Sequence, residues 1–437
     1  MTLSERENKG SILIIGAGTF GLSTALELAQ KGLSNVCCFD KYKVPSPIAA
    51  GNDSNKIFDY PYLAPSEEPS TSERLDLEAR DEWKKNPIYE PHYHPVGLIE
   101  AASSEKPLLD TIKRFQYLRE AKIKDYRYID TPEQFREYLP ILKGELQGWR
   151  GFVLDQDNGW VHARNSLIDT YKEAKRLGVQ FYFGEDGEIV DVDYGKNEVV
   201  SIIAKSGKKY TGEKYVMTLG ASAVKILNFE SQLEAKCFTL VHIKVTDEEA
   251  KDFKGLPVVF NSERGFFFEP DENNEIKICN EFPGHTNYID KGESIPLHKM
   301  EIPLEAANDV RQFLKETMPQ LANRPFVKTR ICWCTDSPNR ELILTTHPQF
   351  KNLIIGSGDS GRSFMLMPII GKYIGKVLIE GDDTLLPQDR ENWKWRPETS
   401  DSRDNKQGRY GGKGLVTDLR DVTEWISAEN PNPHKLP

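Results

Sequence analysis

A short strand, a glycine-rich turn and a helix follow one another in residues 11–32, and this stretch constrains the fold more than any other. The apolar run 12–15 is typical of a buried parallel strand. It leads into Gly16-Ala17-Gly18-Thr19-Phe20-Gly21, after which apolar residues recur with helical spacing. This order is typical of the first unit of a doubly wound sheet, so we expect an α/β fold with a Rossmann-like domain.

Each glycine of the turn has its own task. Gly16 permits the tight turn, Gly18 lets backbone approach a pyrophosphate, and Gly21 lets the helix pack closely on the strand. The helix N-terminus directs N–H groups and partial positive charge toward phosphates. Asp40 follows the second strand, 36–39, where its carboxylate can accept hydrogen bonds from a ribose. The sequence therefore predicts a dinucleotide site, and an ordinary glycine-rich strand–helix turn is the alternative.

Composition excludes several classes of protein. The chain has 437 residues, a net charge of −10 and no long basic block, so nucleic-acid binding is not expected. No apolar run is long enough to span a membrane, and the polar N-terminus argues against a secretory signal. Six cysteines in a chain of this length do not form a disulfide framework. We expect an intracellular protein that is cytoplasmic or, with a different native C-terminus, peroxisomal.

Two later stretches extend the nucleotide-binding part. Residues 209–218 read as one strand that stops at a turn containing Gly220 and Ala221, and residues 352–379 repeat the order of strand, glycine turn and helix. Between them, short apolar strands predict a largely antiparallel sheet in a substrate domain of α+β type. The expected parts are a discontinuous nucleotide-binding domain (1–60, 151–235 and 326–384), a substrate-binding domain (61–150 and 236–325) and a tail that docks on the body (385–437).

Ten segments spread over nearly the whole chain carry a family resemblance: GAGTFGLSTALELA, PSPIAAGNDSNK, GWVHARN, TLVHI, ERGFFFEPDE, EIKICNE, ETMPQLANRPF, RICWCTDSPNRE, GDSGRSF and GRYGG. In combination they resemble the fungal amadoriases, also called fructosyl amino acid or fructosyl peptide oxidases. These enzymes belong to the flavoprotein group of monomeric sarcosine oxidase and D-amino acid oxidase. The resemblance implies a monomer with a small-molecule substrate.

The resemblance also implies FAD, attached through a cysteine of the RICWC segment. By motif position this is Cys332, with Cys334 as the alternative. From the residues alone, two inert buried thiols would be the commoner explanation. No partner Cys or His pair has zinc spacing, so no metal is expected. The expected cofactor-binding residues are Gly16, Gly18, Thr19, Phe20, Gly21, Asp40, Lys41, Ser46, Asn52, Asp53, Lys56, Val190, Gly220, Ala221, Cys332, Gly358, Gly361, Arg362 and Met365.

Catalytic and substrate-binding residues follow from the same resemblance. Lys277 corresponds to a lysine that promotes the reaction with oxygen, since a fixed positive charge stabilises developing negative charge. Lys56 corresponds to a lysine near flavin and substrate, and Asn55 is expected to help place a water or proton relay. Glu281 is expected to contact substrate, and Arg409 to grip a substrate carboxylate with its planar guanidinium. Without the resemblance, Lys277 would be interpreted as a lysine on the solvent side of a strand. Glu281 and Arg409 would be ordinary surface charges, and Lys56 and Asn55 would simply belong to a turn.

Met365 departs from the family pattern, which usually has a substrate-contacting lysine at this position. Methionine supplies no charge but adapts to apolar shapes, so it is expected to shift substrate preference, toward α-fructosyl substrates or peptides.

The implied reaction is oxidation of the C–N bond of a fructosyl amino acid or peptide to an imine, which hydrolyses to glucosone and free amine, while oxygen becomes hydrogen peroxide. An oxidase of another secondary amine, such as sarcosine or pipecolate, is the nearest alternative. Two further alternatives are an NAD-dependent dehydrogenase and a non-catalytic flavin-binding protein. The dehydrogenase would give the GDSGRSF turn no function. The flavin-binding protein would bind FAD but oxidise no amine substrate. His162 and His347 are expected to be structural.

Overall fold

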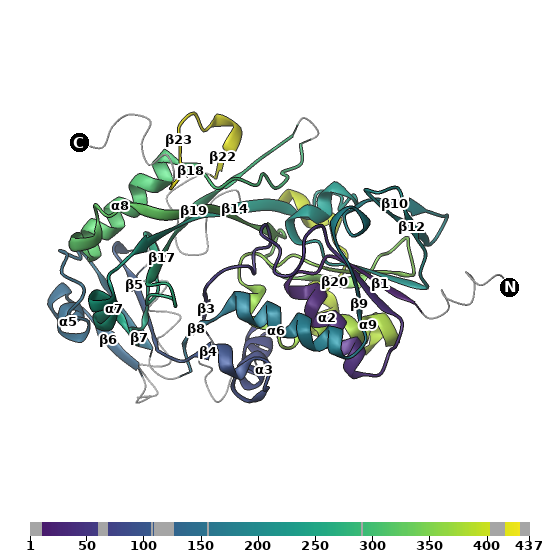
Figure 1. Cartoon of the computed structure of the whole chain (residues 1–437), viewed down its shortest axis with the longest axis horizontal. Helices are drawn as coiled ribbons and strands as arrows, with labels where there is room; N and C mark the ends of the chain where they lie inside the picture. Colours follow the sequence, from purple (N-terminus) through teal and green to yellow (C-terminus); the bar gives the residue numbers. More distant parts are fainter. Residues whose placement is uncertain are drawn as a thin grey trace.

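The computed structural model describes residues 11–59, 69–105, 108, 126–154, 157–289, 292–402 and 416–428. Two large sheets organise these residues. In Figure 1 the sheet that contains β1 lies on the right, and the sheet that contains β5 and β7 lies on the left. Among the described residues, no helix has both the length and the apolar character to cross a bilayer.

The first sheet has six strands in the order β20-β21-β13-β1-β2-β9. Neighbouring strands are parallel except β20 and β21, which are antiparallel. This mainly parallel sheet with helices packed on it confirms the expected α/β class. Its strands are β1 (Ile12–Ile15), β2 (Val36–Phe39), β9 (Gln180–Tyr182), β13 (Lys214–Met217), β20 (Ile343–Thr346) and β21 (Leu353–Ser357).

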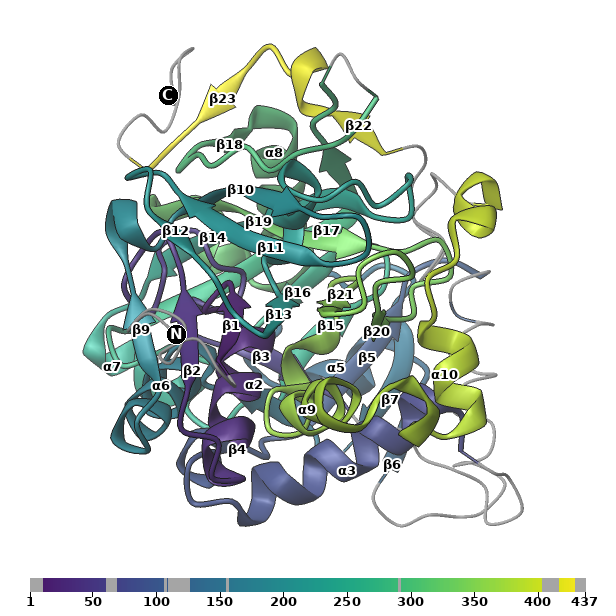
Figure 2. The ribbon, with the colours of Figure 1, turned by 90° about the vertical axis from the view of Figure 1, so that its right-hand side faces the viewer.

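Alternate residues of β1 enter two different cores, as expected for a strand buried on both faces. Ile12 and Ile14 pack with helices α2 (Thr19–Gln30), α6 (Ala163–Arg176) and α9 (Ile370–Glu380). Leu13 and Ile15 face a small sheet formed by β10 (Ile189–Tyr194), β11 (Val199–Ala204) and β12 (Lys209–Tyr210). Figure 2 shows α2 and α9 side by side below β1.

The expected single strand at 209–218 was wrong in one respect. Residues 209–210 form β12 and residues 214–217 form β13, and the two belong to different sheets. Gly212 lies between them, and a Cβ there would come within 2.8 Å of the Leu13 side chain. The chain therefore passes from one sheet to the other at Gly212, where a larger side chain would collide with Leu13.

The second sheet has nine strands, and its main path runs β19-β14-β17-β16-β15-β5-β7-β6, with β22 beside β17. It is largely antiparallel, as expected, and the exceptions are the parallel pairs β5–β15 and β17–β22. Helix α8 (Leu304–Thr317) packs against its core. The strands are β5 (Leu98–Ala102), β6 (Tyr126–Ile129), β7 (Arg150–Leu154), β14 (Glu234–Lys244), β15 (Val258–Asn261), β16 (Gly265–Phe267), β17 (Glu275–Thr286), β19 (Phe326–Asp336) and β22 (Thr417–Asp418).

Helix α3 (Thr71–Lys85) packs with the helices of the first sheet. It begins at a capping box in which Ser70 and Glu73 bond each other's backbone N–H groups. It lies in the segment assigned to the substrate-binding domain, yet its Leu75, Ala79 and Trp83 enter the core under α2 and α9. The domain boundaries stay a prediction. The remaining elements are β3 (Lys56–Phe58), β4 (Tyr93–His94), β8 (Gly159–Val161), β18 (Ile302–Pro303), β23 (Trp425–Ile426), α5 (Pro132–Tyr138), α7 (Asp247–Phe253) and α10 (Pro387–Trp393).

Candidate active site

Residues of both large sheets line one cavity of about 980 Å³. Gly16 and Asp40 reach it from the carboxyl ends of β1 and β2, which is where doubly wound sheets bind their ligands. Lys277 and Cys332 reach it from β17 and β19 of the other sheet. The cavity therefore brings the nucleotide-binding turn together with the charged and nucleophilic side chains expected from sequence.

The three glycines of the turn have the geometry that their expected tasks require. Gly16 has a φ of 108°, and a Cβ there would lie 2.5 Å from the Thr218 carbonyl oxygen. A Cβ on Gly21 would lie 1.7 Å from the carbonyl oxygen of Gly16, so only glycine lets α2 approach β1 this closely. A Cβ on Gly18 would meet nothing within 4 Å, and Gly18 lines the cavity. The backbone is thus open to a ligand at the start of α2.

Asp40 braces this turn from the end of β2. Its carboxylate accepts hydrogen bonds from the backbone N–H groups of Ala17 (2.9 Å) and Tyr42 (3.0 Å). Burial raises the pKa of Asp40, and the backbone hydrogen bonds oppose that rise. Beside it, the Lys41 ammonium lies 3.0 Å from Glu188, and this contact raises the pKa of Lys41. Asp40 and Lys41 therefore present an acceptor and a cation at the nucleotide end of the cavity.

Two arginines hold the loop 46–56 against the cavity. Arg330 donates to the carbonyl oxygens of Ala49 and Asn52, each at 2.6 Å. Arg164, at the start of α6, donates to the Asn52 side chain at 2.9 Å. The Asn52 amide in turn donates to the Ser46 carbonyl at 3.0 Å. Asn52 therefore acts within the loop and does not itself line the cavity.

Lys277 and Lys56 share a single carboxylate on this loop. The Lys277 ammonium donates to Asp53 Oδ2 and to the carbonyl oxygen of Asn55, both at 2.6 Å. The Lys56 ammonium lies 3.0 Å from the same Asp53 oxygen. The side chains of Lys277 and Asp53 are only 2% and 3% exposed, so this ion pair is buried. Burial alone would raise the pKa of Asp53, but Lys277, Lys56 and Arg330 hold it well below its usual value.

The two cysteines of the RICWC segment occupy different surroundings. Cys332 is half-buried, and its Sγ lies 3.9 Å from the Lys56 ammonium. Cys334 is buried, with Sγ 3.6 Å from a carboxylate oxygen of Asp336. Burial and the charge of Asp336 raise the pKa of the Cys334 thiol well above its usual value. A cation therefore lies beside the sulfur of Cys332, and a carboxylate lies beside the sulfur of Cys334.

The cavity wall contains buried hydroxyl groups with which a polar ligand would form hydrogen bonds. The side-chain oxygens of Ser46 and Ser357 are buried, and within the described part of the chain neither has a hydrogen-bond partner. Both residues line the cavity. Because an unsatisfied buried hydroxyl is costly, a ligand rich in hydrogen-bonding groups fits this wall. The open turn at Gly18 and these hydroxyls together fit a dinucleotide such as FAD.

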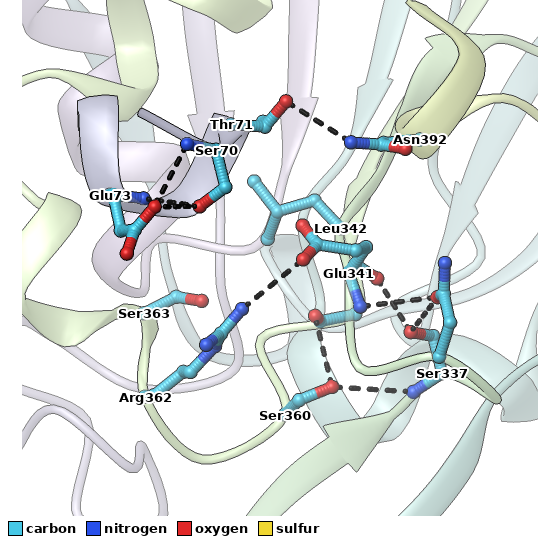
Figure 3. Close-up of polar contacts among 12 residues, drawn as sticks. Ser70, Thr71, Glu73, Ser337, Glu341, Leu342, Ser360, Arg362, Ser363 and Asn392 are labelled. Carbon is cyan, nitrogen blue, oxygen red and sulfur yellow. Dashed lines mark hydrogen bonds and ion pairs between the residues drawn. The ribbon is translucent and has the colours of Figure 1, made fainter. Parts of the chain in front are cut away.

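The far end of the cavity is built by η5 (Ser363–Leu366) and the first turns of α3. Met365 lies in this wall, and its carbonyl oxygen accepts a hydrogen bond from the Trp83 indole at 2.7 Å. Figure 3 shows Arg362 extending toward Glu341, which it approaches to 3.5 Å, and the capping box of Ser70 and Glu73 at the start of α3. This end therefore combines the apolar side chain of Met365 with polar groups from two segments.

Most of the expected site residues line the cavity: Gly16, Gly18, Thr19, Phe20, Asp40, Lys41, Ser46, Asp53, Lys56, Val190, Gly220, Ala221, Lys277, Cys332, Gly361, Arg362 and Met365. Gly21, Asn52, Asn55 and Gly358 are outside its lining. Glu281 belongs to β17, but its side chain is outside the described part, and Arg409 lies outside the described residues.

Sequence reasoning missed several lining residues, including Ser357, Phe238, Phe260, Phe266, Lys225 and His298. Ser357 could have been found, because it ends a buried strand directly before a glycine turn. The three phenylalanines lie in predicted strands, but their facing depends on the sheet register. The expected structural role of His162 has support, because its Nδ1 accepts the Asn165 N–H at 3.4 Å and caps α6.

Comparison with known proteins gives a consistent picture. Residues 11–377 match the family described as FAD dependent oxidoreductase. The chain is 42% identical to the crystal structure of the deglycating enzyme fructosamine oxidase (Amadoriase II) from Aspergillus fumigatus in complex with FSA, with a TM-score of 0.90 and coverage of 96% and 97% of the two chains. It is 36% identical to Amadoriase I from the same organism, with a TM-score of 0.88 and coverage of 95% and 97%. It is 28% identical to L-saccharopine oxidase from Schizosaccharomyces pombe, with coverage of 88% and 93%.

We predict that Ser357→Ala reduces the stabilisation that FAD confers. An unsatisfied buried hydroxyl costs about 1–3 kcal/mol, so removing it should leave the Tm of the apoprotein unchanged or higher. The rise in Tm on adding FAD should be smaller, because the ligand loses one hydrogen bond. Thermal unfolding with and without FAD measures both, in a Cys332→Ser background in which no bond between this sulfur and the flavin can form.

Ser262→Ala is the matched control, since its hydroxyl is also buried and unpartnered in the described region but lies outside the cavity. Its FAD-induced rise in Tm should equal that of the background. An undiminished rise in Ser357→Ala would contradict the prediction.

Proposed function

Because the chain belongs to the FAD dependent oxidoreductase family, and within it to the fructosamine oxidases, we propose that it oxidises fructosyl amino acids or short fructosyl peptides. The C–N bond becomes an imine, which hydrolyses to glucosone and the free amine or peptide, and oxygen is reduced to hydrogen peroxide. One observation carries this proposal: a single cavity joins the nucleotide turn to Lys277 and Met365 in a chain 42% identical to a fructosamine oxidase. The family resemblance further favours a monomer in the cytoplasm or the peroxisome.

FAD, when bound, supplies the hydride acceptor and passes the electrons to oxygen. The chain's own residues provide orientation and charge. The buried ammonium of Lys277 stabilises negative charge that develops on oxygen, as fixed charges do in water-poor sites. Asn55, whose carbonyl oxygen fixes Lys277, helps to place a water or proton relay. Glu281 and Arg409 bind the polar end of the substrate, Arg409 through bidentate contact with a carboxylate.

An oxidase of another secondary amine, such as sarcosine or pipecolate, is the second candidate. Met365 favours it, because the cavity wall has no fixed charge at this position. The similarity to a protein named L-saccharopine oxidase points in the same direction.

We expect the purified protein to release hydrogen peroxide in air with fructosyl-valine, fructosyl-valyl-histidine or ε-fructosyl-lysine, and not with sarcosine. A coupled peroxidase assay with the four substrates side by side makes the measurement. Peroxide from sarcosine alone would move the chain to the second candidate. A yellow protein that releases none from any of the four would contradict the proposed substrate.

We propose that FAD is bound covalently through Cys332. Cys332 would hold the flavin through a carbon–sulfur bond to a ring methyl group of FAD, with one proton leaving that methyl group and oxygen accepting the two electrons released. Lys56 would assist, because its ammonium lies 3.9 Å from the sulfur and provides a fixed positive charge beside it. Burial alone would lower the pKa of Lys56, but the neighbouring Cys332 and Asp53 raise it, so Lys56 remains a cation.

We predict that Cys332→Ser abolishes covalent flavin and that Cys334→Ser retains it. The reason is that Cys334 lies near a carboxylate and Cys332 near a cation. Flavin fluorescence of the protein band after denaturing electrophoresis checks this. A fluorescent Cys332→Ser band beside a dark Cys334→Ser band would assign the bond to the other sulfur.

We predict that Met365→Lys shifts the preference from fructosyl-valyl-histidine toward fructosyl-valine. A lysine can pair with the carboxylate of the smaller substrate and takes room from the peptide, so the ratio of the two kcat/KM values should change by about 10-fold or more. Met365→Leu preserves the apolar wall and should keep the wild-type ratio. Equal ratios in wild type and Met365→Lys would remove the idea that this position sets specificity.

A further inference from the structure

We propose that Asp53 is a positioning residue that holds Lys277 for the reaction with oxygen and Lys56 for attachment of the flavin to Cys332. The proposal rests on the proposed function and deepens it. A single oxygen of the Asp53 carboxylate contacts both ammonium groups: that of Lys277 at 2.6 Å and that of Lys56 at 3.0 Å. Lys56 then extends the chain of contacts to the Cys332 sulfur at 3.9 Å.

Two lysines from different strands meet at this oxygen, and a third strand supplies the sulfur beside one of them. Lys277 comes from β17 and lies 224 positions from Asp53. Lys56 opens β3, three residues after Asp53, and Cys332 comes from the middle of β19. Lys277 also lies over the ring of Phe268, at 4.9 Å from its centroid. The ammonium is therefore enclosed by a carboxylate, a carbonyl oxygen and an aromatic face, and Asp53 supplies its only carboxylate contact among the described residues.

Asp53 itself is held in place and cannot follow a lysine that moves. Its second carboxylate oxygen accepts the Ser54 N–H at 3.0 Å. Its backbone carbonyl accepts the Arg164 N–H at 2.9 Å. Arg330 fixes the loop on the other side through Asn52 and adds a third positive charge near the carboxylate. A carboxylate anchored in this way sets where both ammonium groups lie.

The Asp53 carboxylate compensates the buried charge of Lys277. A buried ammonium without a partner is costly, because the interior of a protein solvates charge poorly. Asp53 therefore fixes where the positive charge of Lys277 lies before oxygen arrives. Without the carboxylate charge, neither ammonium would be held in its place, and Lys56 would be free to leave the Cys332 sulfur.

The test uses full-length Asp53→Asn, which keeps the size of the side chain and removes its charge. After chemical reduction of the bound flavin with dithionite, its reoxidation by oxygen is followed by stopped flow. We expect the rate constant to fall on the order of 100-fold, as when one fixed electrostatic contact is lost from a reacting centre. Covalent flavin, measured by fluorescence of the denatured band, should also fall.

Single-lysine variants separate the two tasks. Lys277→Met should slow reoxidation and keep covalent flavin, and Lys56→Met should lose covalent flavin and keep most of the reoxidation rate. Asp53→Glu retains the charge and should restore part of both readouts. Glu275→Gln is the matched control: it removes a different, largely buried carboxylate at the start of β17, which contacts Lys328 at 2.7 Å and His242 at 3.0 Å, and none of these three residues lines the cavity. It should leave both readouts unchanged.

Wild-type behaviour of Asp53→Asn in both readouts would overturn the proposal, and so would equal losses in Glu275→Gln. Failure of the proposed function is distinguishable, because dithionite reduction and the fluorescence measurement need no substrate. A wild-type protein that no fructosyl substrate reduces would contradict the substrate assignment and leave the role of Asp53 still open to the same two measurements.

Discussion

Direct backbone contact between layers is the constraint on which the nucleotide-binding part depends. At Gly21, α2 approaches the turn so closely that a Cβ would lie 1.7 Å from the Gly16 carbonyl oxygen. At Gly371, α9 approaches α2 in the same way, with a Cβ position 2.2 Å from the Ser23 carbonyl oxygen. Overpacking of even a few atoms typically costs about 1–3 kcal/mol in a close-packed core. The two glycines therefore set the distance between β1, α2 and α9, and with it the position of the turn that faces the cavity.

Buried charge connects this part to the second sheet. The loop after β2 presents Asp53, and β17 presents Lys277, so Lys277 gains its carboxylate partner only when the two parts meet. Losing one partner of a buried ion pair typically costs about 3–5 kcal/mol, whereas the intact pair contributes little net stability. The pair thus acts mainly to specify how the loop and the sheet join. This requirement places the ammonium of Lys277, the Cys332 sulfur and the end of the nucleotide turn along one cavity.

Local patterns in the sequence predicted the parts of the site that are themselves local. The β1 strand, the turn and α2 follow from a few adjacent residues, and Asp40 follows from its spacing after the turn. The pairing of Lys277 with Asp53 has no local pattern, because the two lie 224 positions apart and meet only when the sheets assemble. The contribution of α3 to the α2–α9 core is non-local for the same reason. The break between β12 and β13 was missed because the sequence of this segment does not show that its two halves pair with strands of different sheets.

Met365 and Lys277 line the same cavity but are held in place by different interactions. At Met365 the backbone is held by the buried Trp83 indole, which bonds the carbonyl oxygen and makes no demand on the side chain. A substitution there alters the wall while the fold of η5 persists. At Lys277 the side chain itself is held by charge, so a substitution there leaves Asp53 without one of its two lysine partners. Because one residue is fixed through its backbone and the other through its side chain, the shape of the wall at Met365 can change without disturbing the buried ion pair.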